Sequence, residues 1–230
     1  MTVARAISRS VAPVIEQLEL DGDSLVTVDR LVTVMRLVGT AADEAAARRL
    51  AYELQRDGWL GRLRTRHVWE FIPGARGGPY GSGDRFIEFR AQHAVDPSWG
   101  GVLAMESAAS VLGLAQRLPE REVVALPAGA PFPKALAGDW RYVRIDLPPA
   151  GLTWVDGLPS WNLEGLIVGI ATRPSTYRDI AGLGQWLPGA AAGVDVAAVL
   201  SLLENARSST RQRAAYLLRA MGDSGIFQVK

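Results

Sequence analysis

The chain has 230 residues, 48% of them hydrophobic and 21% charged, which is enough for one large or two small domains with a buried core. It has no cysteine, which excludes disulfides, thiolate metal sites and cysteine nucleophiles, and its only histidines are His67 and His93. Its net charge is +1, and its longest apolar runs are far shorter than the roughly 20 residues of a membrane-spanning helix, so we expect a cytoplasmic protein.

Charge is unevenly distributed along the chain. Between Ala45 and Gly78 there are seven basic and three acidic residues, a net charge of +4, whereas residues 84–199 have 9 basic and 12 acidic residues, a net charge of −3. This contrast predicts a polyanionic partner for the first segment only. Lysine occurs only at Lys134 and Lys230, so nearly all positive charge is arginine. Such a bias favours bidentate contacts with phosphate and guanine, although a GC-rich genome produces it as well.

Three helices are predicted in the part of the chain before Gly58. Apolar residues at helical spacing predict a first helix that ends near Leu20, with Pro13 either in its first turn or at a kink. Thr27 is expected to cap a second helix, which ends at Gly39. Residues 40–43 resemble a capping box, so Thr40 is expected to begin a third helix only a short turn after the second.

The third helix and the segment after it contain the candidate DNA-binding residues. The polar face of the helix presents long side chains that can reach phosphates and base edges, namely Arg48, Arg49, Tyr52, Gln55 and Arg56. After Gly58 the pattern has period two, which predicts a β-hairpin that turns near residues 66–67 and presents Arg62, Arg64 and Arg66. Helices followed by a basic hairpin predict a winged helix-turn-helix. A helix face that is merely solvated is the alternative interpretation of these arginines.

A composition break divides the chain. Residues 73–83 contain five glycines and two prolines and are predicted to link an N-terminal domain at 1–80 to a second domain at 84–230. In the second domain we expect strands at 121–126 and 141–147, and helices at 84–93, 101–114, 163–171, 175–187, 194–205 and 210–221. The predicted fold class is therefore α/β, α+β overall: a winged helix-turn-helix followed by a larger mixed α/β domain.

The second domain shows no pattern that is typical of an active site. Its carboxylates include Glu88, Glu106, Asp146, Asp156 and Glu164, but their spacing does not bring them together as a catalytic or metal-binding set. No phosphate-binding loop, nucleophile elbow or histidine-rich metal motif occurs in the sequence. We therefore expect a protein that is not an enzyme and that binds neither a metal nor a cofactor.

Four segments together resemble the AbiEi-type antitoxins of type IV toxin–antitoxin systems: LQRDGWLGRLR at 54–64, VWEFIPGA at 68–75, ESAASVLGL at 106–114 and RPSTYRD at 173–179. The resemblance implies a repressor that binds inverted repeats in its own operator. It also implies a C-terminal domain that counteracts a nucleotidyltransferase-like toxin. Such proteins commonly have a glycine just before the aromatic residue of the wing turn, where this chain has His67 and Val68.

Two other functions remain open at the level of sequence. The first is a winged-helix regulator whose C-terminal domain senses a small ligand, which a large pocket with converging polar groups would support. The second is a nucleic-acid enzyme with an unrecognised site, which clustered carboxylates that bind a divalent ion would support.

Overall fold

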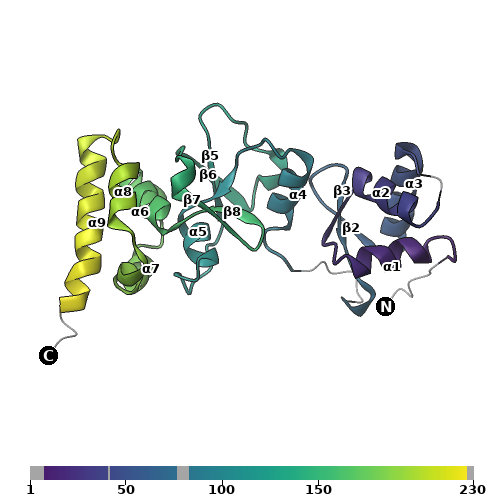
Figure 1. Ribbon diagram of the computed structural model, residues 1–230, viewed down its shortest axis with the longest axis horizontal. Coiled ribbons are helices and arrows are strands. Elements are labelled where there is room, and N and C mark those ends of the chain that lie inside the picture. Colours follow the sequence, from purple (N-terminus) through teal and green to yellow (C-terminus); the bar gives the residue numbers. More distant parts are fainter. Residues whose placement is uncertain (1–7, 41, 77–82, 227–230) are drawn as a thin grey trace. The chain divides into compact units, whose positions relative to one another are not determined.

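The computed structural model describes residues 8–40, 42–76 and 83–226, and the contacts within it divide the chain into two units, Met1–Trp99 and Gly100–Lys230 (Figure 1). Each unit combines helices with its own β-sheet, so the predicted mixed α/β fold is confirmed. None of the helices in these ranges is both long and apolar enough to cross a membrane.

The first unit begins with three helices, α1 (Ala12–Leu20), α2 (Val28–Leu37) and α3 (Glu44–Arg56). Pro13 lies in the first turn of α1, where its missing N–H costs nothing, so the alternative of a kink does not apply. Thr27 caps α2 as predicted, because its side-chain oxygen accepts a hydrogen bond from the backbone N–H of Arg30 at 3.1 Å.

The turn between α2 and α3 differs from the predicted capping box. Gly39 has a φ of +75°, the left-handed conformation expected after a helix. Thr40 does not cap α3; its N–H and its hydroxyl both donate to the carbonyl of Met35, each at 2.9 Å. The N-cap is Asp43, whose Oδ1 accepts from the N–H of Ala46 at 2.6 Å. Thr40 therefore terminates the second helix rather than starting the third.

A small antiparallel sheet completes this part of the unit, with β1 (Leu25–Thr27), β3 (Val68–Phe71) and β2 (Leu60–Arg62) in that spatial order. The predicted hairpin is formed by β2 and β3, and it pairs Leu60 with Phe71. The strand β1 has no counterpart among the predicted elements. All four residues of β3 are buried, so the expected alternation of buried and exposed residues does not occur there. The assignment of this unit as a winged helix-turn-helix stays a prediction.

The helix α4 (Ile87–Val95) belongs to the first unit and packs against β1 and β3. The composition break at 73–83 instead places this segment in the second domain. The attachment is specific, because the carboxylate of Glu88 accepts hydrogen bonds from the backbone N–H of Arg64 at 2.5 Å and from the N–H and hydroxyl of Thr65 at 3.1 and 3.0 Å. The helix therefore holds the loop between β2 and β3 in place.

The second unit contains a five-stranded mixed sheet. Its strands are β4 (Val102–Leu103), β5 (Glu122–Leu126), β6 (Trp140–Arg144), β7 (Leu152–Val155) and β8 (Leu158–Trp161). Their spatial order is β6-β5-β4-β8-β7. The pairs β5–β6 and β4–β8 are parallel, whereas the pairs β4–β5 and β7–β8 are antiparallel.

Helices cover this sheet in two layers. α6, apolar from Gly165 to Ala171, is buried between α5 and β8 on one side and α8 and α9 on the other (Figure 1). The helix bounds are Met105–Val111 for α5, Leu163–Thr172 for α6, Ile180–Trp186 for α7, Val196–Leu202 for α8 and Ser208–Ile226 for α9. The helix predicted at 101–114 begins only at Met105, after β4, and that predicted at 175–187 is a short 3-10 turn followed by α7.

Gly169 allows α6 to pack closely on the indole of Trp161. A Cβ atom at Gly169 would lie 2.2 Å from Cζ3 of Trp161, a side chain with no exposed surface. We expect Gly169→Ala to lower the free energy of unfolding by about 1–3 kcal/mol in urea denaturation, because the buried ring has no space into which to move.

The matched control for this substitution is Gly184→Ala in α7, where a new Cβ would meet nothing within 4 Å. That variant is expected to gain up to about 1 kcal/mol from the better helix propensity of alanine. Equal stability of the two variants would contradict the packing argument.

Candidate nucleic-acid interface

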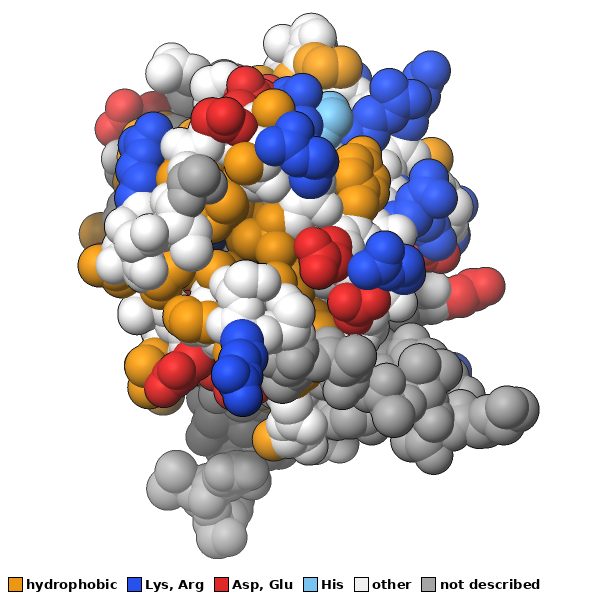
Figure 2. Space-filling model, turned by 90° about the vertical axis from the view of Figure 1, so that its right-hand side faces the viewer, with side chains coloured by type: hydrophobic (Ala, Val, Ile, Leu, Met, Phe, Trp, Pro, Cys, Tyr) orange, Lys and Arg blue, Asp and Glu red, His pale blue; other side chains and the backbone are white. Residues whose placement is uncertain are grey.

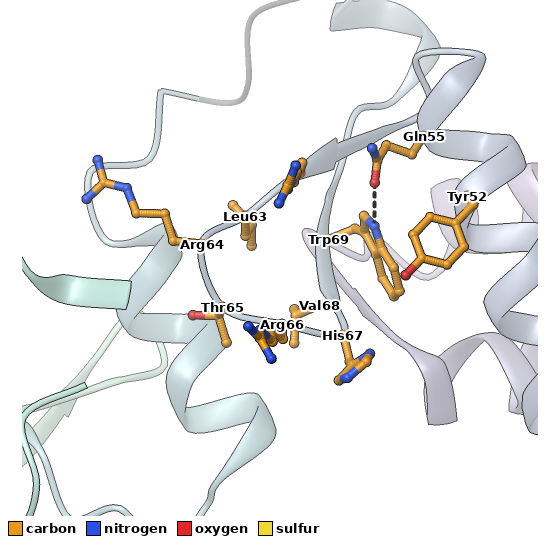
Figure 3. A pocket seen from close by; sticks show the side chains of 10 residues that line it. Tyr52, Gln55, Leu63, Arg64, Thr65, Arg66, His67, Val68 and Trp69 are labelled. Atoms are coloured by element: carbon orange, nitrogen blue, oxygen red, sulfur yellow. Dashed lines mark hydrogen bonds between the residues drawn. The ribbon is translucent and has the colours of Figure 1, made fainter. Parts of the chain in front are cut away.

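A groove of about 770 Å³ lies in the first unit between α3 and the loop that joins β2 to β3 (Figure 3). We call this loop, together with β2 and β3, the wing. The residues that line the groove are Tyr52, Gln55, Arg62, Leu63, Arg64, Thr65, Arg66, His67, Val68 and Trp69. Five of the eight residues predicted to bind DNA are therefore brought to one groove.

The α3 side of the groove is built on Trp69. Its indole Nε1 donates a hydrogen bond to Oε1 of Gln55 at 2.9 Å, and its ring meets that of Tyr52 edge to face, with centroids 6.0 Å apart. The indole is buried, whereas Tyr52 is 59% exposed. The bond fixes the orientation of the Gln55 amide and leaves its Nε2 as the donor that a ligand in the groove can meet.

The wing side of the groove is positively charged. Arg62, Arg64 and Arg66 are exposed, and none of the ten residues that line the groove is acidic. Figure 2 shows one face of the first unit, with basic side chains gathered along one side of it and acidic ones interspersed. Several guanidinium groups without a carboxylate in the same groove favour a polyanionic ligand.

Thr65 explains why the wing holds this shape. Its side chain is buried between exposed arginines, and Glu88 accepts from its hydroxyl and from two backbone N–H groups of the loop. Because a carboxylate that receives several hydrogen bonds strongly favours one geometry, the wing arginines project from a fixed backbone.

His67 occupies the left-handed conformation in the wing turn, with a φ of +64°. This is the position at which the family resemblance leads us to expect a glycine, and histidine is among the residues that tolerate such a φ better than most. We expect His67→Val to lower the free energy of unfolding by about 1–2 kcal/mol, because a β-branched residue is strained there.

His67→Gly is expected to change the melting temperature little, because glycine adopts the same backbone conformation without strain. Arg66→Val serves as the control at an adjacent exposed position whose backbone is not left-handed. A His67→Val protein as stable as Arg66→Val would show that the turn has changed its conformation.

The other three predicted residues of α3 do not line the groove. Arg48 forms an ion pair with Glu44 one helical turn earlier, and Arg49 is exposed. Arg56 donates from Nε to Oδ1 of Asp57 at 3.1 Å, a contact that raises the pKa of its guanidinium. The interactions are at the surface, where such pairs contribute little, so they leave these arginines available to a stronger anionic partner.

Sequence patterns do not identify three residues of this site. The pattern around Trp69 indicates a core residue, and Trp69 is buried, but it also positions Gln55. Thr65 and Glu88 are 23 residues apart, and no local pattern reveals their contact. The left-handed turn at His67 does have a signal in the sequence, because the family that the chain resembles commonly has a glycine at this place in the turn.

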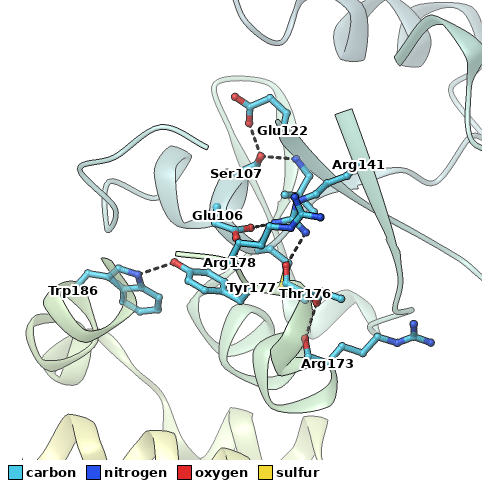
Figure 4. A network of polar contacts seen from close by, with 11 residues as sticks. Glu106, Ser107, Glu122, Arg141, Arg173, Thr176, Tyr177, Arg178 and Trp186 are labelled. Carbon is cyan, nitrogen blue, oxygen red and sulfur yellow. Dashed lines mark hydrogen bonds and ion pairs between the residues drawn. The ribbon is translucent and has the colours of Figure 1, made fainter. Parts of the chain in front are cut away.

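The second unit contains a buried polar network (Figure 4). The carboxylate of Glu106, 3% exposed, accepts hydrogen bonds from Nη2 of Arg141 and from the backbone N–H of Arg178. Nη1 of Arg141 donates to the carbonyl of Thr176 at 2.6 Å. Burial lowers the pKa of Arg141, and the nearby charge of Arg178 acts in the same direction. The network joins α5, β6 and the RPSTYRD segment.

Tyr177 lies beside this network and is buried. Its hydroxyl accepts a hydrogen bond from Nε1 of Trp186 at 3.0 Å, and burial raises the pKa of the phenol to about 12. The neighbouring Asp179 caps α7 by accepting from the N–H of Gly182 at 3.0 Å. Within the RPSTYRD segment, the side chains of Tyr177 and Asp179 therefore organise this part of the fold.

The five carboxylates considered as catalytic candidates have separate partners or positions. Glu88 holds the wing, Glu106 pairs with Arg141, and Glu164 accepts from the N–H of Asp195 at 2.9 Å. Within the described ranges, no group of three or more His, Asp or Glu side chains is placed to hold a metal ion.

Fold and site together define a mixed α/β protein whose first unit has a basic groove beside a helix and whose second unit contains an ion pair between Glu106 and Arg141 above an apolar core. A family model described as the AbiEi antitoxin C-terminal domain matches residues 101–220. The crystal structure of the RV2827C protein from Mycobacterium tuberculosis is similar over 97% of this chain and 81% of that chain, with 31% sequence identity and a TM-score of 0.77. No curated protein gives a match.

The chain belongs to the AbiEi antitoxin family. Membership implies a toxin as its partner, because an antitoxin acts against one. The family match lies in the second unit, whereas the likeness to the RV2827C protein extends over both units.

Proposed function

We propose that the first unit is a winged helix-turn-helix domain that binds duplex operator DNA through α3 and the wing. The observation that carries this proposal is the groove lined by Tyr52 and Gln55 of α3 and by three exposed wing arginines, with no carboxylate among its lining residues. In this arrangement α3 enters the major groove, and the wing contacts the phosphate backbone or the minor groove.

The eight proposed contact residues have different roles in this arrangement. Arg62, Arg64 and Arg66 neutralise phosphates and supply affinity for any sequence. The residues of α3 reach base edges and phosphates and supply the preference for the operator; they are Arg48, Arg49, Tyr52, Gln55 and Arg56. Inverted repeats in the operator would match a dimer of the chain on DNA.

We further propose that the chain represses its own operon in the cytoplasm as the antitoxin of a type IV pair, and that the second unit counteracts a nucleotidyltransferase-like toxin. Family membership supports an antitoxin, and the family match lies wholly within the second unit. No catalytic step is assigned to the chain; of its candidate carboxylates, Glu88 anchors the wing and Glu106 forms an ion pair with Arg141.

The test uses the whole chain, co-expressed with a nucleotidyltransferase-like gene if one adjoins its own gene, and with a reporter under the chain's own promoter. The unaltered chain is expected to restore growth and to silence the reporter. A variant with Arg62, Arg64 and Arg66 replaced by alanine is expected to lose repression by at least tenfold while it still restores growth at equal protein level.

Each result bears on one half of the proposal. A reporter that remains active with the unaltered chain would refute autorepression. Growth arrest in the presence of the folded variant would show that neutralisation depends on the DNA-binding groove, so the division of roles between the two units would be wrong.

A further inference from the structure

The second unit has a polar recess of about 310 Å³ that is unrelated to the DNA groove. This volume is at the lower end of the range of small-molecule sites, about 300–1,000 Å³. Four arginines and three carboxylates line it, together with Leu118 and Pro119; the charged residues are Arg117, Arg121, Arg141, Arg178, Glu106, Glu120 and Asp179.

Two of the three carboxylates are already engaged by the fold. Glu106 accepts from Nη2 of Arg141 and from the N–H of Arg178 (Figure 4). Asp179 accepts from the N–H of Gly182 to cap α7. Oxygen atoms of these two carboxylates are therefore occupied as acceptors within the fold, and the four arginines and three carboxylates leave the recess with a net charge of +1 (4 − 3). Glu120 is exposed.

The arginines form a cluster of like charge around Arg141. The side chain of Arg141 is only 13% exposed and is held by Glu106 and by the carbonyl of Thr176. Arg121 and Arg178 are exposed, and both lie close enough for their charges to act on the guanidinium of Arg141. Like charges that converge on one recess repel one another unless an anion lies between them.

Arg121 and Arg178 can still bind such an anion. Arg121 uses one N–H, donating from Nη2 to the carbonyl of Trp140 at 2.5 Å, which fixes its position at the edge of β6. Arg178 is held through its backbone N–H, and its guanidinium makes no hydrogen bond with any residue of the described ranges. Several donors therefore remain on each of the two groups.

The backbone beside the recess is strained. Met105 directly precedes Glu106, has a φ of +51° and is fully buried, with its sulfur 3.8 Å from the hydroxyl of Thr176. A buried residue other than glycine in the left-handed region costs on the order of 1–3 kcal/mol, and such strain concentrates where the fold positions a binding group.

We propose that this recess binds the phosphate group of a small phosphate monoester, with Arg121 and Arg178 contacting the phosphate oxygens and Arg141 fixed beside them. A phosphate dianion offers three acceptor oxygens, and the planar guanidinium matches them in bidentate pairs. A concave recess of this size accommodates a small ligand better than a chain segment of a protein partner. This site is independent of operator binding.

The experiment is isothermal titration calorimetry of the whole chain at constant ionic strength, with three probes: inorganic phosphate, a sugar phosphate and a nucleoside monophosphate. We expect saturable binding of at least one probe. Arg121→Gln and Arg178→Gln should each weaken it by about ten- to hundredfold, the decrease expected when a charge-assisted hydrogen bond is removed. Both substitutions are at exposed positions, so the folded protein is retained.

Arg173→Gln is the matched control, because Arg173 is exposed at the other end of the RPSTYRD segment and does not line the recess. Unchanged binding by this variant supports the proposal, and the tightest probe identifies the group attached to the phosphate. Two results would overturn it: no saturable binding of any probe below about 10 mM, or an equal decrease in affinity for Arg173→Gln. Operator binding measured on the same variants should not change, so the proposal can fail while the DNA-binding function stands.

Discussion

Replacement of Arg62, Arg64 and Arg66 by alanine is expected to weaken binding of the whole chain to its operator by about a hundredfold or more at moderate salt. Each arginine that contacts a phosphate releases condensed counterions, so its removal reduces both affinity and salt dependence. The slope of log K against log salt should become shallower by about 2.7 when three phosphates are no longer neutralised. Operator and unrelated duplex DNA should be affected alike, because phosphates carry no sequence information.

A mobility-shift titration at several salt concentrations measures both quantities. The control variant removes three arginines from α9 and the turn before it instead, Arg207, Arg211 and Arg219, which are exposed in the second unit. It changes the net charge equally, so an equal decrease in affinity would show that total charge rather than the groove governs binding.

Substitutions in α3 should have a different signature. Gln55→Ala, or the combined change of Arg48, Arg49 and Arg56 to alanine, is expected to reduce discrimination between the operator and unrelated DNA by about 1–3 kcal/mol for each base that is no longer recognised. Unaltered operator binding in the α3 arginine variant would exclude those three residues from the reading face.

Glu106→Gln is expected to lower the free energy of unfolding by about 3–5 kcal/mol, the largest effect on stability predicted for any side chain of the second unit. The substitution leaves the guanidinium of Arg141, a side chain that is only 13% exposed, without its carboxylate, and an unpaired charge that is largely shielded from water is far more costly than an exposed one. Urea denaturation followed by circular dichroism measures the change.

Two further variants separate charge burial from a general effect of the substitution. Glu120→Gln changes an exposed carboxylate at the same recess and should alter stability by less than about 0.5 kcal/mol. The double change Glu106→Leu with Arg141→Met removes both charges and should recover most of the stability. A Glu106→Gln protein as stable as Glu120→Gln would contradict the buried pair.

Sequence patterns predict the helices of the first unit and the strands β5 and β6 of the second, because these elements have clear periodicity and turn residues. Strand β4 is hidden in the run from Val102 to Leu112, where nearly every residue is apolar or small and no period distinguishes a strand from a buried helix. Contacts with β5 and β8, far away in the chain, make this segment a strand.

The hairpin β7–β8 is absent from the predicted elements for a different reason. Pro159 lies within β8 and argues against a strand, since proline cannot donate to the sheet. A signal is nevertheless present in Asp156-Gly157, which have φ values of +50° and +71° and form the tight turn that such a pair favours.

Sequence patterns predict which residues belong to the candidate site, but not how those residues are arranged within it. The stripe on α3 and the alternation after Gly58 identify the residues that could face DNA, since both depend on local spacing. Which of them share a groove depends on Trp69 and Glu88, whose contacts join segments 14 and 23 or more residues apart. Such contacts follow from the packing of the whole unit and leave no periodic trace.

The anchoring of the wing by Glu88 has a practical consequence for crystallising the protein with DNA. A recombinant fragment that ends inside the glycine-rich segment would lack α4, and the loop around Thr65 would lose all three of its hydrogen bonds to that carboxylate. A fragment that extends to Trp99 retains them together with the aromatic cluster of Phe89, His93 and Trp99. The longer fragment is therefore the better choice for growing co-crystals with an operator duplex.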